Sequence, residues 1–181
     1  LQYSLFTPLF RNPSADGTRL QELYQFDNIA SAAEMIKIRY ALIPYLYSEF
    51  LKAALNDEMM FRPLAFDFPE DNTAKQAEDQ LFLGNELMIA PIYKQNAQGR
   101  YVYLPEEMMM ISMKSVSDYT AAVLPAGHHY VEVPLDTLVF FIRKGKAIPF
   151  GAAADNTSQI DMSALRLLGY DGSTYELYSD N

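Results

Sequence analysis

The chain has 181 residues, of which 50% are hydrophobic and 13% aromatic, with a formal net charge of −9 and no cysteine. This composition allows a sizeable core and excludes a disordered chain, and the negative charge argues against nucleic acid or an anionic membrane as a partner. The absence of cysteine excludes a disulfide framework and fits a reducing compartment, so we expect a cytoplasmic protein. No run approaches the roughly 20 apolar residues that a membrane-spanning helix needs.

The first ten residues, "LQYSLFTPLF", mix aromatic and aliphatic side chains and predict a strand or its approach. The stretch "RNPSADG" at residues 11–17 follows and is rich in turn residues. Arg11 therefore falls where a buried strand opens into solvent, and its planar, permanently charged side chain would suit hydroxyl groups or a carboxylate. From the residues alone, a salt bridge that fixes the loop is the favoured interpretation.

Residues 31–57, "SAAEMIKIRYALIPYLYSEFLKAALND", predict a long helix because apolar side chains recur every three or four positions. Ser31 and Glu34 have the spacing of a capping box, in which each side chain satisfies a free backbone N–H at the start of a helix. Pro44 lacks an N–H and crowds the carbonyl of the preceding turn, so we expect a kink there.

Residues 59–68 predict a buried strand, and residues 73–84 predict a short helix that Gly84 closes. After Gly84 the chain consists of short β-rich runs separated by turn residues, which predicts a β-sandwich or barrel. Asp171-Gly172, between two strand-like arms, is the strongest hairpin signal. We therefore expect an α/β part followed by an all-β part, with a boundary near Gly84. The β-rich runs are "ELMIAPIY", "RYVYLP", "MMMISMK", "HHYVEVPL", "LVFFIRKG" and "ALRLLGY".

The sequence offers little catalytic chemistry of its own. His128 and His129 are the only histidines, and neighbours on a strand point to opposite faces, so we expect no metal site there. No serine-nucleophile motif or phosphate-binding loop is present, and we expect no cofactor. Asp67, Glu70 and Asp71 follow a predicted strand, but an ordinary acidic loop explains them better, and we assign no catalytic pair.

The order of several segments resembles the C-terminal part of glycoside hydrolase family 31, the α-glucosidase and isomaltase family. The resemblance implies that residues 1–83 are the closing segment of a (β/α)₈ TIM barrel, with "FRPLAF" as its last strand. Residues 84–181 would form the C-terminal β-sandwich that follows the barrel. The segments are "PLFRNPSADGTRLQELYQF", "IRYALIPYLYSEF", "MFRPLAFDFPED", "DQLFLGNELMIAPI", "YVYLP", "AGHHYVEVPLD" and "FFIRKGKAIP".

The resemblance also implies a function. Family members cleave α-linked glucosides with retention, using two aspartates in barrel motifs that have no counterpart in this chain. The chain therefore resembles a C-terminal fragment that lacks the catalytic residues and is inactive alone. The family pattern at Arg11 is Arg-Asn-His, which places Arg11 at the rim of the sugar pocket. Pro13 stands where the family has a sugar-binding His, and since proline offers no donor, we expect that contact to be lost.

Two further expectations follow. The alternative to an enzyme fragment is a non-catalytic, degenerate or split-gene module that binds carbohydrate or acts as a scaffold. Aromatic residues such as Tyr101, Tyr103, Tyr130 and Tyr175 could stack on sugars, although alternating core positions explain them more simply. An open barrel segment would expose apolar surface, so we expect residues 1–83 to mediate self-association or association with the missing barrel portion.

Overall fold

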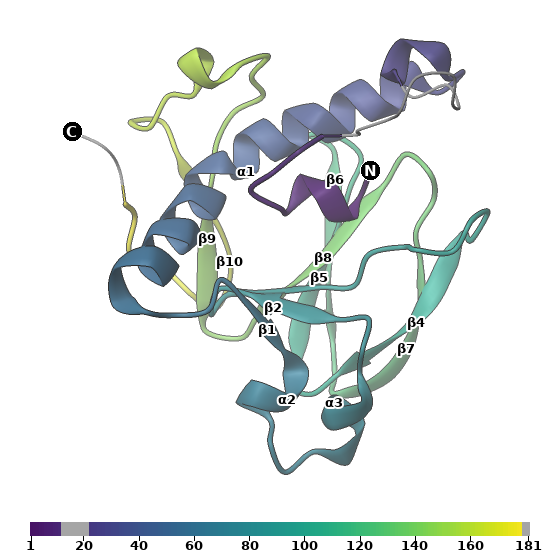
Figure 1. Cartoon of the computed structure of the whole chain (residues 1–181), viewed down its shortest axis with the longest axis vertical. Helices are drawn as coiled ribbons and strands as arrows, with labels where there is room; N and C mark the ends of the chain where they lie inside the picture. Colours follow the sequence, from purple (N-terminus) through teal and green to yellow (C-terminus); the bar gives the residue numbers. More distant parts are fainter. Residues whose placement is uncertain (12–21, 179–181) are drawn as a thin grey trace.

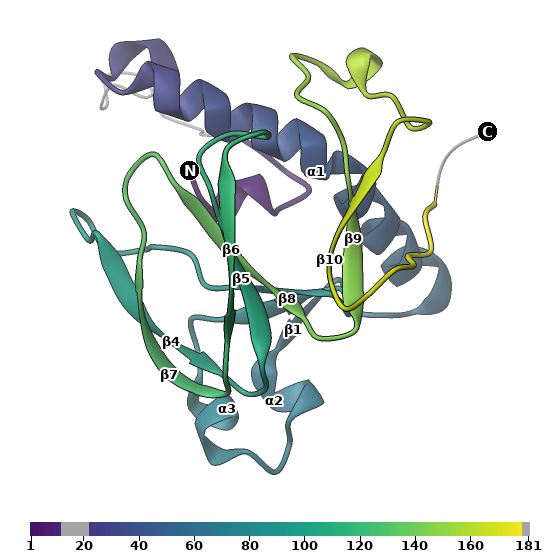
Figure 2. The same ribbon diagram turned by 180° about the vertical axis from the view of Figure 1, so that it is seen from behind.

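A computed structural model of the chain describes residues 1–11 and 22–178. One long helix crosses one face of a six-stranded antiparallel sheet, and two two-stranded ribbons lie beside that sheet (Figures 1 and 2). The α-helices are α1 (Ile29–Asn56), α2 (Leu64–Asp67) and α3 (Asn72–Gln76), and the 3-10 helices are η1 (Tyr3–Leu5), η2 (Leu23–Gln25) and η3 (Thr157–Gln159). The strands are β1 (Phe61–Pro63), β2 (Leu81–Leu83), β3 (Leu87–Ile89), β4 (Gly99–Leu104), β5 (Met108–Met113), β6 (Tyr119–Leu124), β7 (Gly127–Glu132), β8 (Leu138–Arg143), β9 (Lys146–Phe150) and β10 (Arg166–Tyr170).

The main sheet has six strands in the order β1-β2-β3-β8-β5-β6, and β4–β7 and β9–β10 form two separate ribbons. Every ladder between these strands is antiparallel. Antiparallel neighbours can be joined by short turns, which agrees with the short connections of this part of the chain. One long helix is followed along the chain by many short antiparallel strands. This order agrees with the predicted α/β part followed by an all-β part.

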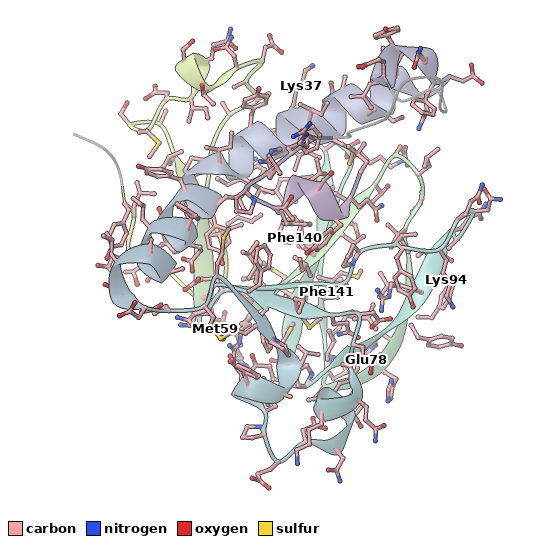
Figure 3. The ribbon with its side chains drawn as sticks, in the orientation of Figure 1. Lys37, Met59, Glu78, Lys94, Phe140 and Phe141 are labelled. Atoms are coloured by element: carbon pink, nitrogen blue, oxygen red, sulfur yellow. The ribbon has the colours of Figure 1, made fainter. Side chains whose placement is uncertain are left out.

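Strand β8 lies at the centre of the main sheet and is buried on both faces. Phe140 belongs to an apolar cluster shared with the α1 residues Ile38 and Leu42. Phe141, its neighbour in the chain, belongs to a second cluster that includes Val102 of β4 and Val131 of β7. Both rings lie near the middle of the molecule (Figure 3). Since neighbouring strand residues point to opposite faces, β8 joins the helix layer to the ribbon layer.

The predicted helix is confirmed as α1, with two differences at its start. The helix begins at Ile29, before Ser31, so Ser31 lies inside the first turn and the predicted capping box does not form. Pro44 lies within the helix, and the Ser48 hydroxyl donates to the Pro44 carbonyl at 2.8 Å. Figure 1 shows that α1 changes direction along its length, as the proline predicts.

Several predictions for the first 84 residues are wrong. Residues 1–10 form η1 and irregular backbone instead of a strand. The predicted strand at residues 59–68 is limited to β1, because Pro63 begins the short helix α2. Strand β1 pairs antiparallel with β2 and forms an edge of the main sheet, and its role as the last barrel strand stays a prediction. The predicted helix at residues 73–84 ends at Gln76, and β2 follows it.

The β-rich part is closer to expectation, because each predicted run after residue 84 contains a strand, namely β3, β4, β5, β7, β8 or β10. The sequence does not predict β6, which is an exposed edge strand without apolar alternation, or β9, which contains Pro149. A proline is tolerated in β9 because this strand has one neighbour in a two-stranded ribbon. The predicted division between residues 83 and 84 runs through the main sheet and stays a prediction.

The predicted hairpin at Asp171-Gly172 does not form. Asp171 has a φ of 55° and makes an isolated bridge to Lys146, and no strand follows it among the described residues. Gly172 lies so close to Lys146 that a Cβ would overlap the lysine backbone. The chain therefore passes along the end of β9 instead of turning back on β10.

Gly84 ends β2 and not a helix, and α1 packs directly against it. Its φ is +60°, and a Cβ at this position would collide with the Glu49 carboxylate and the Tyr45 hydroxyl of α1. The Tyr45 hydroxyl donates to the Leu83 carbonyl at 2.5 Å, which fixes the helix over this turn. A glycine is required here both for the backbone conformation and for the close approach.

We expect Gly84→Ala to lower the free energy of unfolding by about 2–4 kcal/mol, because backbone strain and overpacking add. The matched control is Gly145→Ala, at a position with a φ of +74° but open space around it, and it should cost only about 1 kcal/mol. Urea unfolding followed by circular dichroism measures both. Equal losses would show that the helix does not pack closely on Gly84.

Candidate functional site

The N-terminal segment that leads to Arg11 is fixed by one side chain of α1. The guanidinium of Arg39 donates to the carbonyls of Ser4, Leu5 and Thr7 at 3.0, 2.8 and 2.8 Å, and to that of Pro8 at 3.2 Å. Backbone carbonyls that would otherwise pair in a strand thus have a side-chain partner, which explains the irregular conformation. Burial lowers the pKa of Arg39, but a guanidinium stays charged at neutral pH.

Arg11 lies at the exposed end of this segment. The preceding residue, Phe10, has its ring 5.1 Å from the Arg39 guanidinium carbon, so Arg39 also orders the approach to Arg11. A concavity of about 530 Å³ adjoins this end, and Glu22 and Phe26 are among its lining residues. Pro13, the other residue predicted for substrate binding, lies outside the described residues.

Large apolar side chains surround this end of the molecule and are exposed. Such a concentration of exposed apolar side chains is unusual for a surface that only meets water. The exposed apolar residues of this N-terminal surface are Leu1, Tyr3, Leu9, Leu23, Tyr24, Phe26 and Ile29.

The acidic loop after β1 is occupied by structural contacts. Asp67 binds Arg62 at 2.9 Å and Arg143 at 2.6 Å, and Arg143 also binds Glu106 at 2.5 Å. Burial alone would raise the pKa of Asp67, but the hydrogen bonds from both arginines outweigh it and the pKa lies below its ordinary value. Asp67 is therefore an ionised anchor between β1 and β8.

The other two acidic residues of this loop have similarly simple environments. The Asp71 carboxylate caps α3 by accepting the backbone N–H of Thr73 and of Ala74, and it accepts the Tyr103 hydroxyl at 2.5 Å. Glu70 is exposed. Asp67 and Asp71 are therefore both bound to neighbouring side chains or backbone groups.

The two histidines lie on opposite faces of β7, as predicted. His128 is exposed and stacks near Tyr103, with ring centroids 5.0 Å apart, whereas the His129 Nε2 lies 2.8 Å from the Pro125 carbonyl. Within residues 1–11 and 22–178, no group of three or more metal-ligating side chains is close enough to hold an ion. In the same ranges no helix is long and apolar enough to cross a membrane.

A buried polar cluster beneath α1 gives no signal in the sequence, because its members come from three distant segments. The Glu86 carboxylate lies 3.2 Å from the Tyr45 hydroxyl, and the Tyr175 hydroxyl donates to Glu49 at 2.6 Å. Lys52 forms an ion pair with Glu49 at 2.8 Å. Burial and then the Glu49 charge raise the pKa of Glu86, and burial raises the pKa of Tyr45 and Tyr175. The cluster joins α1 to the β2–β3 turn.

Two of the tyrosines that the sequence assigned most simply to core positions are on the surface. Tyr101 is 71% exposed and Tyr130 is 57% exposed, and their ring centroids lie 5.3 Å apart across the β4–β7 ribbon. Tyr103 is half-buried, and Tyr175 packs against the core of α1. The simpler interpretation therefore fails for Tyr101 and Tyr130.

Comparison with known proteins gives two adjacent family matches. The model described as "Glycosyl hydrolases family 31 TIM-barrel domain" matches residues 1–49, and the one described as "Glycosyl hydrolase family 31 C-terminal domain" matches residues 57–148. The chain is 32% identical to alpha-glucosidase 2 of Bacillus thermoamyloliquefaciens, over 100% of the chain and 23% of that protein. It is 31% identical to mouse lysosomal alpha-glucosidase, over 87% of the chain and 18% of that protein.

Solved structures agree with these matches. A dextranase of Flavobacterium johnsoniae, solved with isomaltotriose, superposes with a TM-score of 0.70 and 28% identity, covering 90% of this chain and 19% of that one. The chain thus spans less than a quarter of each relative named here. The predicted fold, the end of a TIM barrel followed by a β domain, is confirmed.

We expect Arg39→Ala to release the N-terminal segment, because four carbonyls lose their donor at once. Amide hydrogen exchange across residues 2–10 should accelerate about tenfold or more, since each lost charged hydrogen bond is worth roughly 1.5–3 kcal/mol. Lys37→Ala on the same helix is the control, because Lys37 pairs with Glu34 on the surface. Unchanged exchange in Arg39→Ala would contradict the anchoring role.

The raised pKa of Glu86 predicts a dependence of stability on pH. The neutral carboxyl is favoured in the folded state. Its contribution to the free energy of unfolding is therefore fully present below the unfolded pKa of 4.5, and it is lost as the pH rises through the pKa of the folded state. Glu86→Gln cannot ionise, and its stability relative to the parent chain should therefore improve between about pH 4.5 and about pH 7.5. Urea unfolding at the two pH values tests this, with the exposed Glu70→Gln as control. If the difference in stability between Glu86→Gln and the parent chain stays constant with pH, the raised pKa of Glu86 is contradicted.

Proposed function

The chain belongs to glycosyl hydrolase family 31, and on that basis we propose that it is the C-terminal portion of a retaining hydrolase of α-linked glucosides. The observation that carries the proposal is the order of the matches, with the barrel domain at residues 1–49 followed by the C-terminal domain at residues 57–148. Its relatives include alpha-glucosidases of which it spans 23% and 18%. The catalytic carboxylates would lie in the barrel part that precedes these residues.

In this proposal the chain supports a sugar pocket instead of cleaving the bond. Arg11 would stand at the pocket rim, where its guanidinium donates to substrate hydroxyls or orients a carboxylate. Arg39 would be a positioning residue, because it fixes the carbonyls of the segment that ends at Arg11. Pro13 would withdraw one hydrogen bond from the sugar and so alter the sugar preference.

A second function is favoured by Pro13 and by the exposed tyrosines of β4 and β7. The chain would then be a non-catalytic module that binds carbohydrate or acts as a scaffold. The two functions differ in one measurable respect, since only the enzyme portion restores hydrolysis when the preceding barrel sequence is present. The cytoplasmic location stays a prediction.

We expect the pure 181-residue chain to release no p-nitrophenol from p-nitrophenyl α-glucoside. The same chain, extended by the sequence that precedes Leu1 in its gene, should hydrolyse this substrate. Within the extended protein, Arg11→Ala should lower kcat/KM by about 10- to 100-fold, the loss expected when one or two charged hydrogen bonds to the substrate are removed. Lys75→Ala, at an exposed position, is the control and should leave kcat/KM unchanged. Turnover by the chain alone, or no turnover by the extended protein, would refute the proposal.

We also expect the chain to associate through its N-terminal surface, either with itself or with the barrel portion. Leu9→Ser and Tyr24→Ser should shift it toward monomer in sedimentation velocity, because both side chains are more than two-thirds exposed, at 71% and 72%. Leu55→Ser, 65% exposed and at the end of α1 farthest from Ile29, is the control. A parent chain that is monomeric at all concentrations would contradict this expectation.

A further inference from the structure

The outer face of the β4–β7 ribbon carries a ladder of aromatic rings. Tyr101 pairs directly with Tyr130, and Tyr103 pairs with His128, so the four side chains share one face of the ribbon. The ring centroids lie 5.3 Å apart in the first pair and 5.0 Å apart in the second. Aromatic rings of this size usually lie in a core, and two neighbouring rings in solvent indicate a surface that binds something.

The ribbon beneath these rings is rigid. Its inner face buries Val102, Leu104 and Val131 in the second apolar cluster. The buried Gln80 side chain binds the backbone of Tyr103 twice, by donating to its carbonyl at 2.6 Å and accepting its N–H at 2.8 Å. The rings therefore stand on a fixed support, which reduces the entropy that a ligand would lose by ordering them.

A third ring extends this surface beside the ribbon. The Tyr93 hydroxyl donates to Asp79 at 3.0 Å, and Arg100 forms an ion pair with Asp79 at 2.5 Å and lies over the Tyr93 ring at 5.3 Å. Tyr93 remains 63% exposed in spite of these contacts. Its ring is thus held in place by polar partners while most of the side chain stays exposed.

All three tyrosines line a concavity of about 340 Å³, and Tyr130 also lines an adjoining one of about 850 Å³. Both concavities are lined by Ile92, Lys94, Ala97 and Tyr130, so they meet along one wall. Figure 3 shows Lys94 on the side of the molecule where β4 and β7 lie. Together they form a groove, defined here as the tyrosine groove, that is large enough for a small oligosaccharide.

The charges around the tyrosine groove cancel. Its lining includes the acids Asp79 and Glu132 and the bases Lys94 and Arg100, two of each sign. A groove with flat apolar rings, several hydrogen-bonding groups and no net charge suits a neutral ligand with apolar faces and hydroxyl edges. A sugar ring has this character, whereas a nucleotide or a phosphate would need excess positive charge.

We propose that the tyrosine groove binds a neutral oligosaccharide, with Tyr101, Tyr130 and Tyr93 stacking on sugar rings. The choice of an α-linked glucan as the ligand rests on the proposed function of the chain. Asp79 and Arg100 would bind hydroxyl groups at the edge of the sugar, since a carboxylate accepts and a guanidinium donates.

The test is a titration of the ¹⁵N-labelled 181-residue chain with millimolar isomaltotriose, followed by amide NMR. The largest shifts should fall on residues 99–103 and 128–132. Tyr101→Ala and Tyr130→Ala should each weaken binding about tenfold, the loss expected for one stacked ring. Phe66→Ala is the control, because Phe66 is another exposed aromatic residue, at 60%, and lies in α2 outside the lining of the groove. Tyr93→Phe keeps the ring but removes the hydroxyl that binds Asp79, and it should weaken binding less than Tyr101→Ala.

Three results would overturn the proposal. They are the absence of shifts at these residues, equal affinity in the alanine variants and the parent chain, and the same shifts with inorganic phosphate in place of the sugar. Failure here is separable from failure of the proposed function, which is measured as hydrolysis by the extended protein. Binding in the tyrosine groove without any hydrolysis would contradict the proposed function and support the oligosaccharide site. Hydrolysis without binding in the groove would support the proposed function and contradict the oligosaccharide site.

Discussion

The structure depends on one strand that is buried on both faces. β8 has the sequence "LVFFIR", a continuous apolar run of the kind that a strand covered on two sides requires. Phe140 faces the layer made by α1, and Phe141 faces the layer made by the β4–β7 ribbon. Removing either layer would leave a row of large apolar side chains in water. The helix α1 and the strands of the C-terminal part therefore share one hydrophobic core.

This shared core connects the C-terminal sheet to the N-terminal segment that ends at Arg11. β8 fixes α1 through the first apolar cluster, and α1 presents Arg39 to the carbonyls of residues 4–8. The position of Arg11 at the end of that segment thus depends on packing against the C-terminal sheet. A destabilising change in the sheet would therefore loosen the N-terminal segment, because each layer holds the next.

The sequence predicts the features that local periodicity determines. The apolar spacing of α1 and the short apolar runs of β3, β4, β5, β7, β8 and β10 are enough to locate those elements. Prediction from the sequence fails where a contact with a residue distant in the chain determines the conformation. Residues 1–10 are apolar enough for a strand, but Arg39 binds their carbonyls, and Gly84 resembles a helix cap but accommodates the close approach of Tyr45. The exposure of Tyr101 and Tyr130 also cannot be predicted from the sequence. Alternation of side chains identifies one face of a strand, but it does not show whether another layer covers that face.

Native-state hydrogen exchange tests the shared core most directly, because it measures the opening free energy of each element separately. If α1 and the C-terminal strands form one unit, the slowest amides of α1, β8 and β7 will exchange with the same free energy and the same dependence on denaturant. If instead the helix opens at a clearly lower free energy while β8 and β7 stay protected, residues 1–56 open independently of the sheet and the account of a shared core is wrong.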